Sequence, residues 1–94
     1  MRTIERSTAF KRDYKRIKAT PHYRKNLDLL FADFLKFLLA DKVLPEKYFD
    51  HSLSGNWNGY RECHIKPDLL LIYRKSDQST LRLARLGSHS ELFD

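Results

Sequence analysis

The four histidines of this chain are its side chains best suited to proton transfer near neutral pH, because the reference pKa of histidine is about 6.5. Three of them lie in the second half: His51 in a loop, His64 in a predicted strand and His89 after the last predicted strand. Asp68 follows His64 across a predicted turn. Adjacent strands can bring such groups to one end of a sheet, so these four residues form the candidate catalytic set. His22 lies at a helix break and has no evident task.

These residue types suit metal-free cleavage of RNA. The reaction needs a base to remove the ribose 2′-OH proton, a cation to stabilise the phosphorane and an acid to protonate the departing 5′ oxygen. Arginine can contact two phosphate oxygens at once, and the candidates are Arg61, Arg82 and Arg85. Aromatic rings can stack on a base, and the candidates are Trp57, Tyr60, Tyr73 and Phe93.

Other interpretations of the same residues stay open. Three histidines and an aspartate are also zinc-ligand types, but the spacing contains neither HxxxH nor CxxC, so we predict no metal and no cofactor. Taken singly, each histidine also fits a structural or merely exposed position. Trp57 and Tyr73 also fit anchors of the core or of a loop. Cys63, beside Ile65 in a predicted strand, fits a small buried hydrophobe.

Positive charge is concentrated at the N-terminal end. Residues 1–25 hold nine basic and two acidic side chains, a local charge of +7 within a total of +6. Such a concentration favours a polyanionic partner, either nucleic acid or an acidic protein, although a solvated helix face would look the same. Lys11 and Lys15 of this segment are candidate RNA contacts.

The positions of the apolar residues predict the elements that carry these groups. A strand over 1–6 precedes a helix capped by Ser7 or Thr8, whose apolar stripe is Phe10, Tyr14 and Ile17. A second helix spans 23–41, a structured loop 48–59, strands 60–65, 69–74 and 80–86, and a tail 88–94. We therefore predict an α+β fold in which two N-terminal helices pack on a small antiparallel sheet.

Alternation along the last predicted strand raises one question of geometry. Arg85 shares its nominal face with Leu81 and Leu83, which are expected in the core. Either a bulge turns Arg85 away, or that face is not wholly apolar.

Length and composition indicate one domain over residues 1–94. A single cysteine allows no internal disulfide, which favours a reducing compartment. The longest apolar run, residues 69–73, is far shorter than the roughly 20 residues of a membrane span, and no apolar stretch follows the charged N-terminus. We expect a cytoplasmic protein that does not contact a membrane.

Two segments resemble a known family. Residues 51–74, HSLSGNWNGYRECHIKPDLLLIYR, and residues 85–93, RLGSHSELF, resemble the YafQ branch of the RelE/ParE toxin superfamily, and the resemblance extends over the whole chain in order. Some relatives carry tryptophan where this chain has Leu69. The resemblance implies a RelE-like, microbial-RNase-like fold. It implies catalytic positions at His51, His64, Asp68, Arg85 and His89, with Arg85 and Phe93 contributing to phosphate and nucleotide contacts.

The resemblance also implies a function. It indicates the toxin of a bacterial type II toxin–antitoxin pair: a ribosome-dependent endoribonuclease that cuts mRNA in the ribosomal A site and is silenced by a cognate antitoxin. Trp57, Arg61, Phe93, Lys11 and Lys15 are then the predicted RNA contacts. Two alternatives remain, a ParE-like gyrase inhibitor without nuclease activity and a non-catalytic RNA-binding module. The spaced histidines argue against the gyrase inhibitor, because inhibition by binding needs no proton donors and acceptors.

Overall fold

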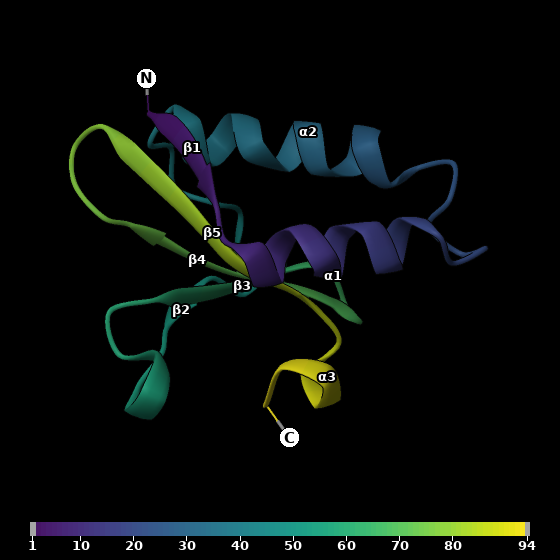
Figure 1. Ribbon diagram of the computed structural model, residues 1–94. Coiled ribbons are helices and arrows are strands. Elements are labelled where there is room, and N and C mark those ends of the chain that lie inside the picture. The colour runs from purple at the N-terminus through teal and green to yellow at the C-terminus, as the bar shows by residue number, and fades with distance from the viewer. Residues whose placement is uncertain (1, 94) are drawn as a thin grey trace.

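Five strands form one sheet in the order β1-β5-β4-β3-β2, and the helices α1 and α2 lie over one of its faces (Figure 1). The computed structural model describes residues 2–93. In chain order the elements are β1 (Thr3–Arg6), α1 (Thr8–Lys18), α2 (Leu27–Leu39), η1 (Glu46–Tyr48), β2 (His51–Ser52), η2 (Gly55–Trp57), β3 (Arg61–Lys66), β4 (Leu69–Lys75), β5 (Thr80–Gly87) and α3 (His89–Phe93). The predicted α+β fold with two N-terminal helices on a small sheet is confirmed.

Local signals account for both long helices. Ser7 caps α1 by accepting a hydrogen bond from the Phe10 amide at 3.0 Å, as predicted, and Phe10 and Ile17 are buried on its apolar stripe. The second helix begins later than predicted, because residues 21–26 form turns, with hydrogen bonds such as those from the Tyr23 and Arg24 amides to the Thr20 carbonyl. It ends before Asp41, whose φ of 56° is left-handed and cannot continue a helix.

The sheet is antiparallel except at one edge. Strands β2, β3, β4 and β5 pair antiparallel in sequence order, as their short connections require. In contrast, β1 pairs parallel with β5, and Thr3 lies opposite Thr80. The two helices and three other strands separate β1 from β5, so no tight turn dictates their relative direction. Of the predicted strand over 1–6, Met1 lies outside the described residues, as does Asp94 of the predicted tail.

Both faces of the sheet are covered, but unequally. The larger cluster lies between the sheet and the two N-terminal helices and includes Phe10, Phe34, Leu71 and Leu83. On the opposite face a smaller cluster contains Leu70, Ile72, Ala84 and Leu92, and Leu53, Trp57, Tyr60 and Phe93 pack against it. Within the predicted tail over 88–94, residues His89–Phe93 form the short helix α3, which lies on this second side (Figure 1). None of the helices within residues 2–93 is long and apolar enough to cross a membrane.

Candidate active site

Two rows of paired residues cross the sheet, with their side chains on the face opposite α1 and α2. Residues paired across strands point to the same face. The first row, from β2 to β5, contains His51, Glu62, Ile72 and Arg85. The second row contains His64, Leu70 and Gly87. Because Leu70 and Ile72 belong to the cluster that also holds Leu92, the histidines and Arg85 lie on the side of α3.

The histidines of β2 and β3 flank a buried carboxylate. Glu62 is 4% exposed, and its Oε1 lies 3.2 Å from Nε2 of His64 and 3.7 Å from Nε2 of His51. Nδ1 of His51 lies 2.8 Å from the carbonyl oxygen of Phe49, which can only accept a hydrogen bond, so this nitrogen carries a proton. Both histidines line a pocket of about 630 Å³, where the Phe49 ring meets the His64 ring edge-on at 5.6 Å. Glu62 thus holds two candidate proton-transfer groups at one edge of the sheet.

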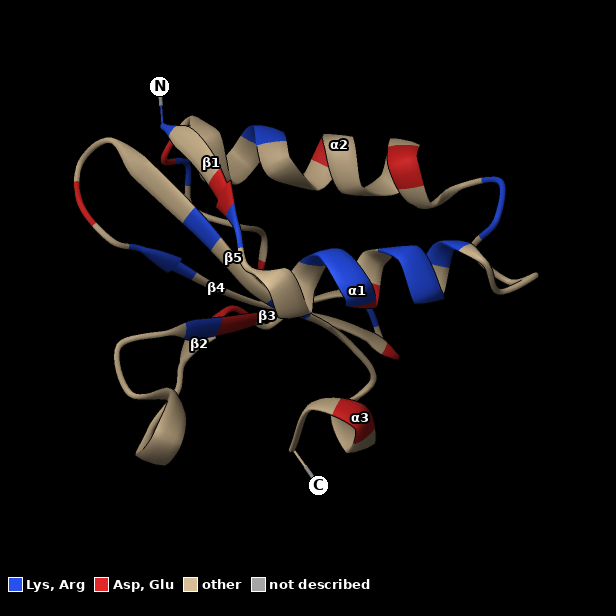
Figure 2. Ribbon diagram, in the orientation of Figure 1, with Lys and Arg blue, Asp and Glu red and all other residues tan. Residues whose placement is uncertain are grey.

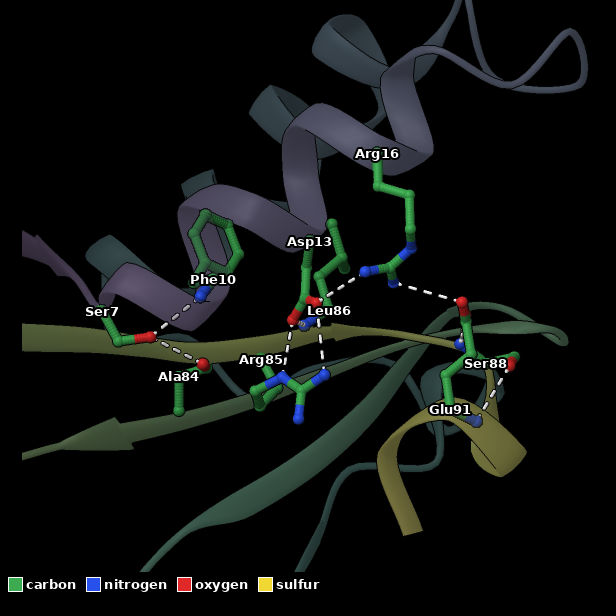
Figure 3. A network of polar contacts seen from close by, with 9 residues as sticks. All are labelled: Ser7, Phe10, Asp13, Arg16, Ala84, Arg85, Leu86, Ser88 and Glu91. Carbon is green, nitrogen blue, oxygen red and sulfur yellow. Dashed lines mark hydrogen bonds and ion pairs between the residues drawn. The ribbon is translucent and has the colours of Figure 1, made fainter. Parts of the chain in front are cut away.

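A bulge in β5 turns Arg85 away from the face that Leu81 and Leu83 share. Ile72 pairs with Arg85 whereas the next residue, Tyr73, pairs with Leu83, so Ala84 is an extra residue and the alternation resets there. The bulge interpretation is therefore confirmed. Arg85 donates from Nε to Oδ2 of Asp13 at 2.7 Å and from Nη2 to Oδ1 at 3.2 Å (Figure 3).

Asp13 is buried on α1 and is only 3% exposed. Besides Arg85, it accepts hydrogen bonds from the Leu86 amide and from Nη1 of Arg16, each at 3.0 Å. Burial alone would raise the pKa of the Asp13 carboxyl, but the hydrogen bonds from Arg85, Leu86 and Arg16 outweigh it and hold the pKa below its usual value. The carboxylate is therefore charged at neutral pH.

The short helix α3 carries His89 and Phe93, whose rings lie 5.0 Å apart. A capping box starts this helix: Glu91 Oε1 accepts from the Ser88 amide at 2.8 Å, and Ser88 Oγ accepts from the Glu91 amide at 3.3 Å. His89 is exposed, whereas Phe93 packs on the smaller cluster together with Trp57. The structure thus gathers one set of predicted site residues on the α3 side of the sheet: His51, Trp57, His64, Arg85, His89 and Phe93.

Comparison with known proteins identifies the family. The model of the family described as "Bacterial toxin of type II toxin-antitoxin system, YafQ" matches residues 2–94. The chain belongs to the YafQ toxin family. It is 37% identical to the mRNA interferase toxin YafQ of Escherichia coli K12, over 98% of this chain and 96% of that protein. The resemblance inferred from residues 51–74 and 85–93 is therefore confirmed.

Solved structures of YafQ-like toxins share the fold. A metal-bound toxin from Helicobacter pylori is 45% identical, with a TM-score of 0.86 over 99% of this chain and 100% of that one. The toxin of an E. coli DinJ–YafQ complex is 34% identical, with a TM-score of 0.80 over the full length of both chains. In the present chain, no group of three or more His, Cys, Asp or Glu side chains within residues 2–93 is arranged to hold a metal ion.

Four predicted site residues lie outside the pocket that His51 and His64 line in this YafQ fold. Asp68 is exposed in the β3–β4 turn and lines a separate hollow with Tyr23 and Ser88. Arg61 is bound by Asp50, Nη2 to Oδ2 at 3.2 Å, and lines another pocket with Tyr73. The remaining two, Lys11 and Lys15, line a groove between α1 and α2. Their parts in catalysis or RNA binding stay predictions, and none of the four lines the pocket of His51 and His64.

Other candidate residues are buried or paired within the fold. Tyr73 is 2% exposed and donates its hydroxyl to Asp50 Oδ1 at 2.6 Å, so it is an anchor and cannot stack on a base. Arg82 pairs with Glu5 on the neighbouring strand. Leu69 is buried, so the position that is tryptophan in some relatives faces the core here. Cys63 is fully buried as predicted, and burial raises the pKa of its thiol.

The sequence pattern did not point to Asp13 and Glu62, the two acidic residues that are buried within residues 2–93. For Asp13 a signal existed, because it lies between Phe10 and Ile17 at helical spacing, where a carboxylate needs a buried partner. Glu62 shares its strand face with His64, but the alternation alone does not reveal that this face is covered.

Proposed function

We propose that this protein is an mRNA interferase, an endoribonuclease that cleaves mRNA on the ribosome through attack of the ribose 2′-OH on the adjacent phosphate. The observation that carries the proposal is that His51, His64 and Arg85 share one sheet face and that α3, which carries His89, packs on the same face. The name of the E. coli relative, an mRNA interferase toxin, supports it. The proposal includes a cytoplasmic location, because the proposed substrate is mRNA on ribosomes.

In this mechanism a histidine beside Glu62 accepts the 2′-OH proton, the 2′ oxygen forms a bond to phosphorus, and the bond from phosphorus to the 5′ oxygen breaks. His89 is the proposed general acid that protonates this leaving oxygen, because it is exposed on α3. Arg85 stabilises the charge of the phosphorane. The products are a 2′,3′-cyclic phosphate and a 5′-hydroxyl. No step requires a metal, since both proton transfers and the charge stabilisation have side chains to perform them.

Nucleotide contacts are proposed for the aromatic residues of the same face. Phe93 touches the His89 ring, and Trp57 meets Tyr60 edge-on at 5.3 Å at the other side of the smaller cluster. A base stacked on either ring would bring its phosphate toward the histidines. We propose that Asp68 orients one proton-transfer group. The proposed role of Lys11, Lys15 and Arg61 is to contact RNA outside the cleaved nucleotide.

The activity is tested by primer extension on a reporter message translated in a purified system. Wild-type protein should cut at defined positions, whereas His64→Ala should cut at least about 100-fold more slowly, because it lacks one proton-transfer group. The ends are typed chemically, since a cyclic phosphate or 3′-phosphate marks 2′-OH attack. The exposed His22→Ala variant is the matched control and should cut like wild type. An intact message beside arrested growth would instead indicate a gyrase inhibitor, and RNA binding without cleavage a binding module.

We further propose a cognate antitoxin as partner, by analogy with the E. coli YafQ that was solved as a complex with DinJ. The basic face of α1 is its proposed contact (Figure 2). There, a groove of about 440 Å³ between the helices combines aromatic walls with four cations, Arg6, Lys11, Lys15 and Lys18. An acidic segment with apolar side chains complements both properties.

This proposal predicts a salt-dependent association with the antitoxin. Raising the ionic strength from about 0.01 M to 0.15 M shortens the Debye length from about 30 Å to 8 Å, so the association rate constant should fall roughly tenfold or more. Stopped-flow mixing at several salt concentrations measures it. Lys15→Glu should reduce the rate further, whereas Lys36→Glu, on an exposed position of α2, should change it little. A rate independent of salt would contradict this contact.

A further inference from the structure

We infer that Asp13 of α1 is a positioning residue for RNA cleavage: it holds the guanidinium of Arg85 with one edge free for a phosphate, and through Arg16 it ties the helix that carries His89 to the same point. The inference rests on the proposed function. Helix α1, which packs on the other face of the sheet, would thus contribute a residue to the site (Figure 3).

Each oxygen of the Asp13 carboxylate accepts two hydrogen bonds. Oδ2 accepts from Nε of Arg85 at 2.7 Å and from the Leu86 amide at 3.0 Å. Oδ1 accepts from Nη2 of Arg85 at 3.2 Å and from Nη1 of Arg16 at 3.0 Å. Four donors match the approximately four lone-pair sites of a carboxylate, so this buried group has one arrangement and no spare acceptor.

Asp13 binds β5 just beyond the point where the pairing of β1 with β5 ends. Pairing of β1 with β5 stops where Arg6 lies opposite Leu83. Beyond that point α1 provides the partners for β5: the Ser7 hydroxyl donates to the Ala84 carbonyl at 2.7 Å, and Asp13 accepts from the Leu86 amide. Ser7, the N-cap of α1, as a donor and Asp13 as an acceptor therefore hold both sides of the bulge that presents Arg85.

This pairing leaves Arg85 able to bind an anion. Asp13 occupies the edge formed by Nε and Nη2, and Nη1 has no hydrogen-bond partner among the described residues. A guanidinium is planar and rigid, so fixing one edge also fixes the direction of the remaining donors. The side chain of Arg85 remains 27% exposed. Asp13 thus orients a cation that solvent, and therefore RNA, can reach.

Arg16 extends the connection to α3. Its Nη1 donates to Asp13, and its Nη2 lies 3.2 Å from Oε2 of Glu91. Glu91 in turn caps the first turn of α3 through the Ser88 amide. The approach is close, because a Cβ added at Gly87 would meet Glu91 Oε1 at 3.0 Å and Leu92 Cδ2 at 3.3 Å. The Arg16–Glu91 pair is about half exposed and should contribute less than Asp13.

The test is Asp13→Asn, which keeps the size of the side chain but turns an NH₂ group toward donors. Single-turnover cleavage of a ribosome-bound message should slow by about 10–100-fold at saturating enzyme, with the half-saturating concentration little changed, since a misdirected cation costs rate more than binding. Asp28→Asn is the matched control: it breaks an ion pair with Lys18 on the other side of α1 and should cleave like wild type. Circular dichroism below the melting temperature confirms that each variant is folded.

Two further measurements separate positioning from stability alone. If Asp13 acts through Arg85, adding Asp13→Asn to Arg85→Ala should slow cleavage no further. Equal slowing in both backgrounds, or a wild-type rate in Asp13→Asn, overturns the inference. If wild type itself cleaves no message, the proposed function fails, and the orientation of Arg85 is judged by NMR. Loss of slow exchange at its Nε–H in Asp13→Asn then supports positioning, and unchanged exchange overturns it.

Discussion

Replacing His89 with alanine should slow mRNA cleavage by about 10²–10⁴-fold, the usual contribution of one general acid or base. His89 is exposed on α3, and Leu92 and the Ser88–Glu91 capping box hold that helix without it. The loss should therefore be in the chemical step and not in the fold. Phe93 loses only the contact with the His89 ring.

The measurement is single-turnover cleavage by folded His89→Ala, compared with wild type on the same ribosome-bound message. A leaving group that needs no protonation provides a direct check on the role. With a 5′-thio substitution at the scissile phosphate, wild type and His89→Ala should cleave at similar rates, because a thiolate departs without an acid. A variant that is equally slow on both substrates would assign His89 to binding or orientation. A wild-type rate on the natural message would remove it from the mechanism.

Leu71→Ala should lower the free energy of unfolding by about 2–5 kcal/mol, the range for truncation of a buried leucine. Leu71 lies on the central strand β4, has no exposed surface and belongs to the cluster between the sheet and the helices. Because the total stability of a domain is usually about 5–15 kcal/mol, this one change should remove a large share of it.

Equilibrium unfolding in urea measures the effect through the transition midpoint and slope. Leu29→Ala provides the matched control, since Leu29 is 73% exposed on α2 and its truncation should change the stability by no more than about 0.5 kcal/mol. Similar losses in both variants would mean that the cluster around Leu71 is not the main support of the fold.

The helices and most of the sheet could be predicted because their signals are local. The cap at Ser7, the stripe of Phe10 and Ile17 and the short turns between β3, β4 and β5 act over a few residues. The parallel pairing of Thr3 with Thr80 is a contact between distant segments, and no local pattern encodes it. The helix α3 was missed although its signal, Ser88 followed by Glu91 at capping-box spacing, is present.

The candidate site was predictable in its residue types but not in its grouping. His51, His64, Arg85 and His89 were selected from chemistry and resemblance. The register of the strands places the first three on one face of the sheet, and His89 lies on α3, which packs on that face through Leu92. The separation of Asp68 depends on which way a two-residue turn faces, which strand alternation does not settle. Asp13 and Glu62 were missed because the partners of a buried carboxylate come from other elements.

The parallel pairing of β1 with β5 also determines when the sheet can be completed during synthesis of the chain. Strand β5 pairs with both β1 and β4, so β1 is not linked to the rest of the sheet until residues 80–87 have been synthesised. A chain grows from its N-terminus at about 5–20 residues per second. Strand β1 therefore has no strand to pair with during most of translation. A nascent chain that is still short of these residues has no Arg85 for Asp13 to hold and no His89. The proposed site is thus completed only after residues 85–89 have been synthesised.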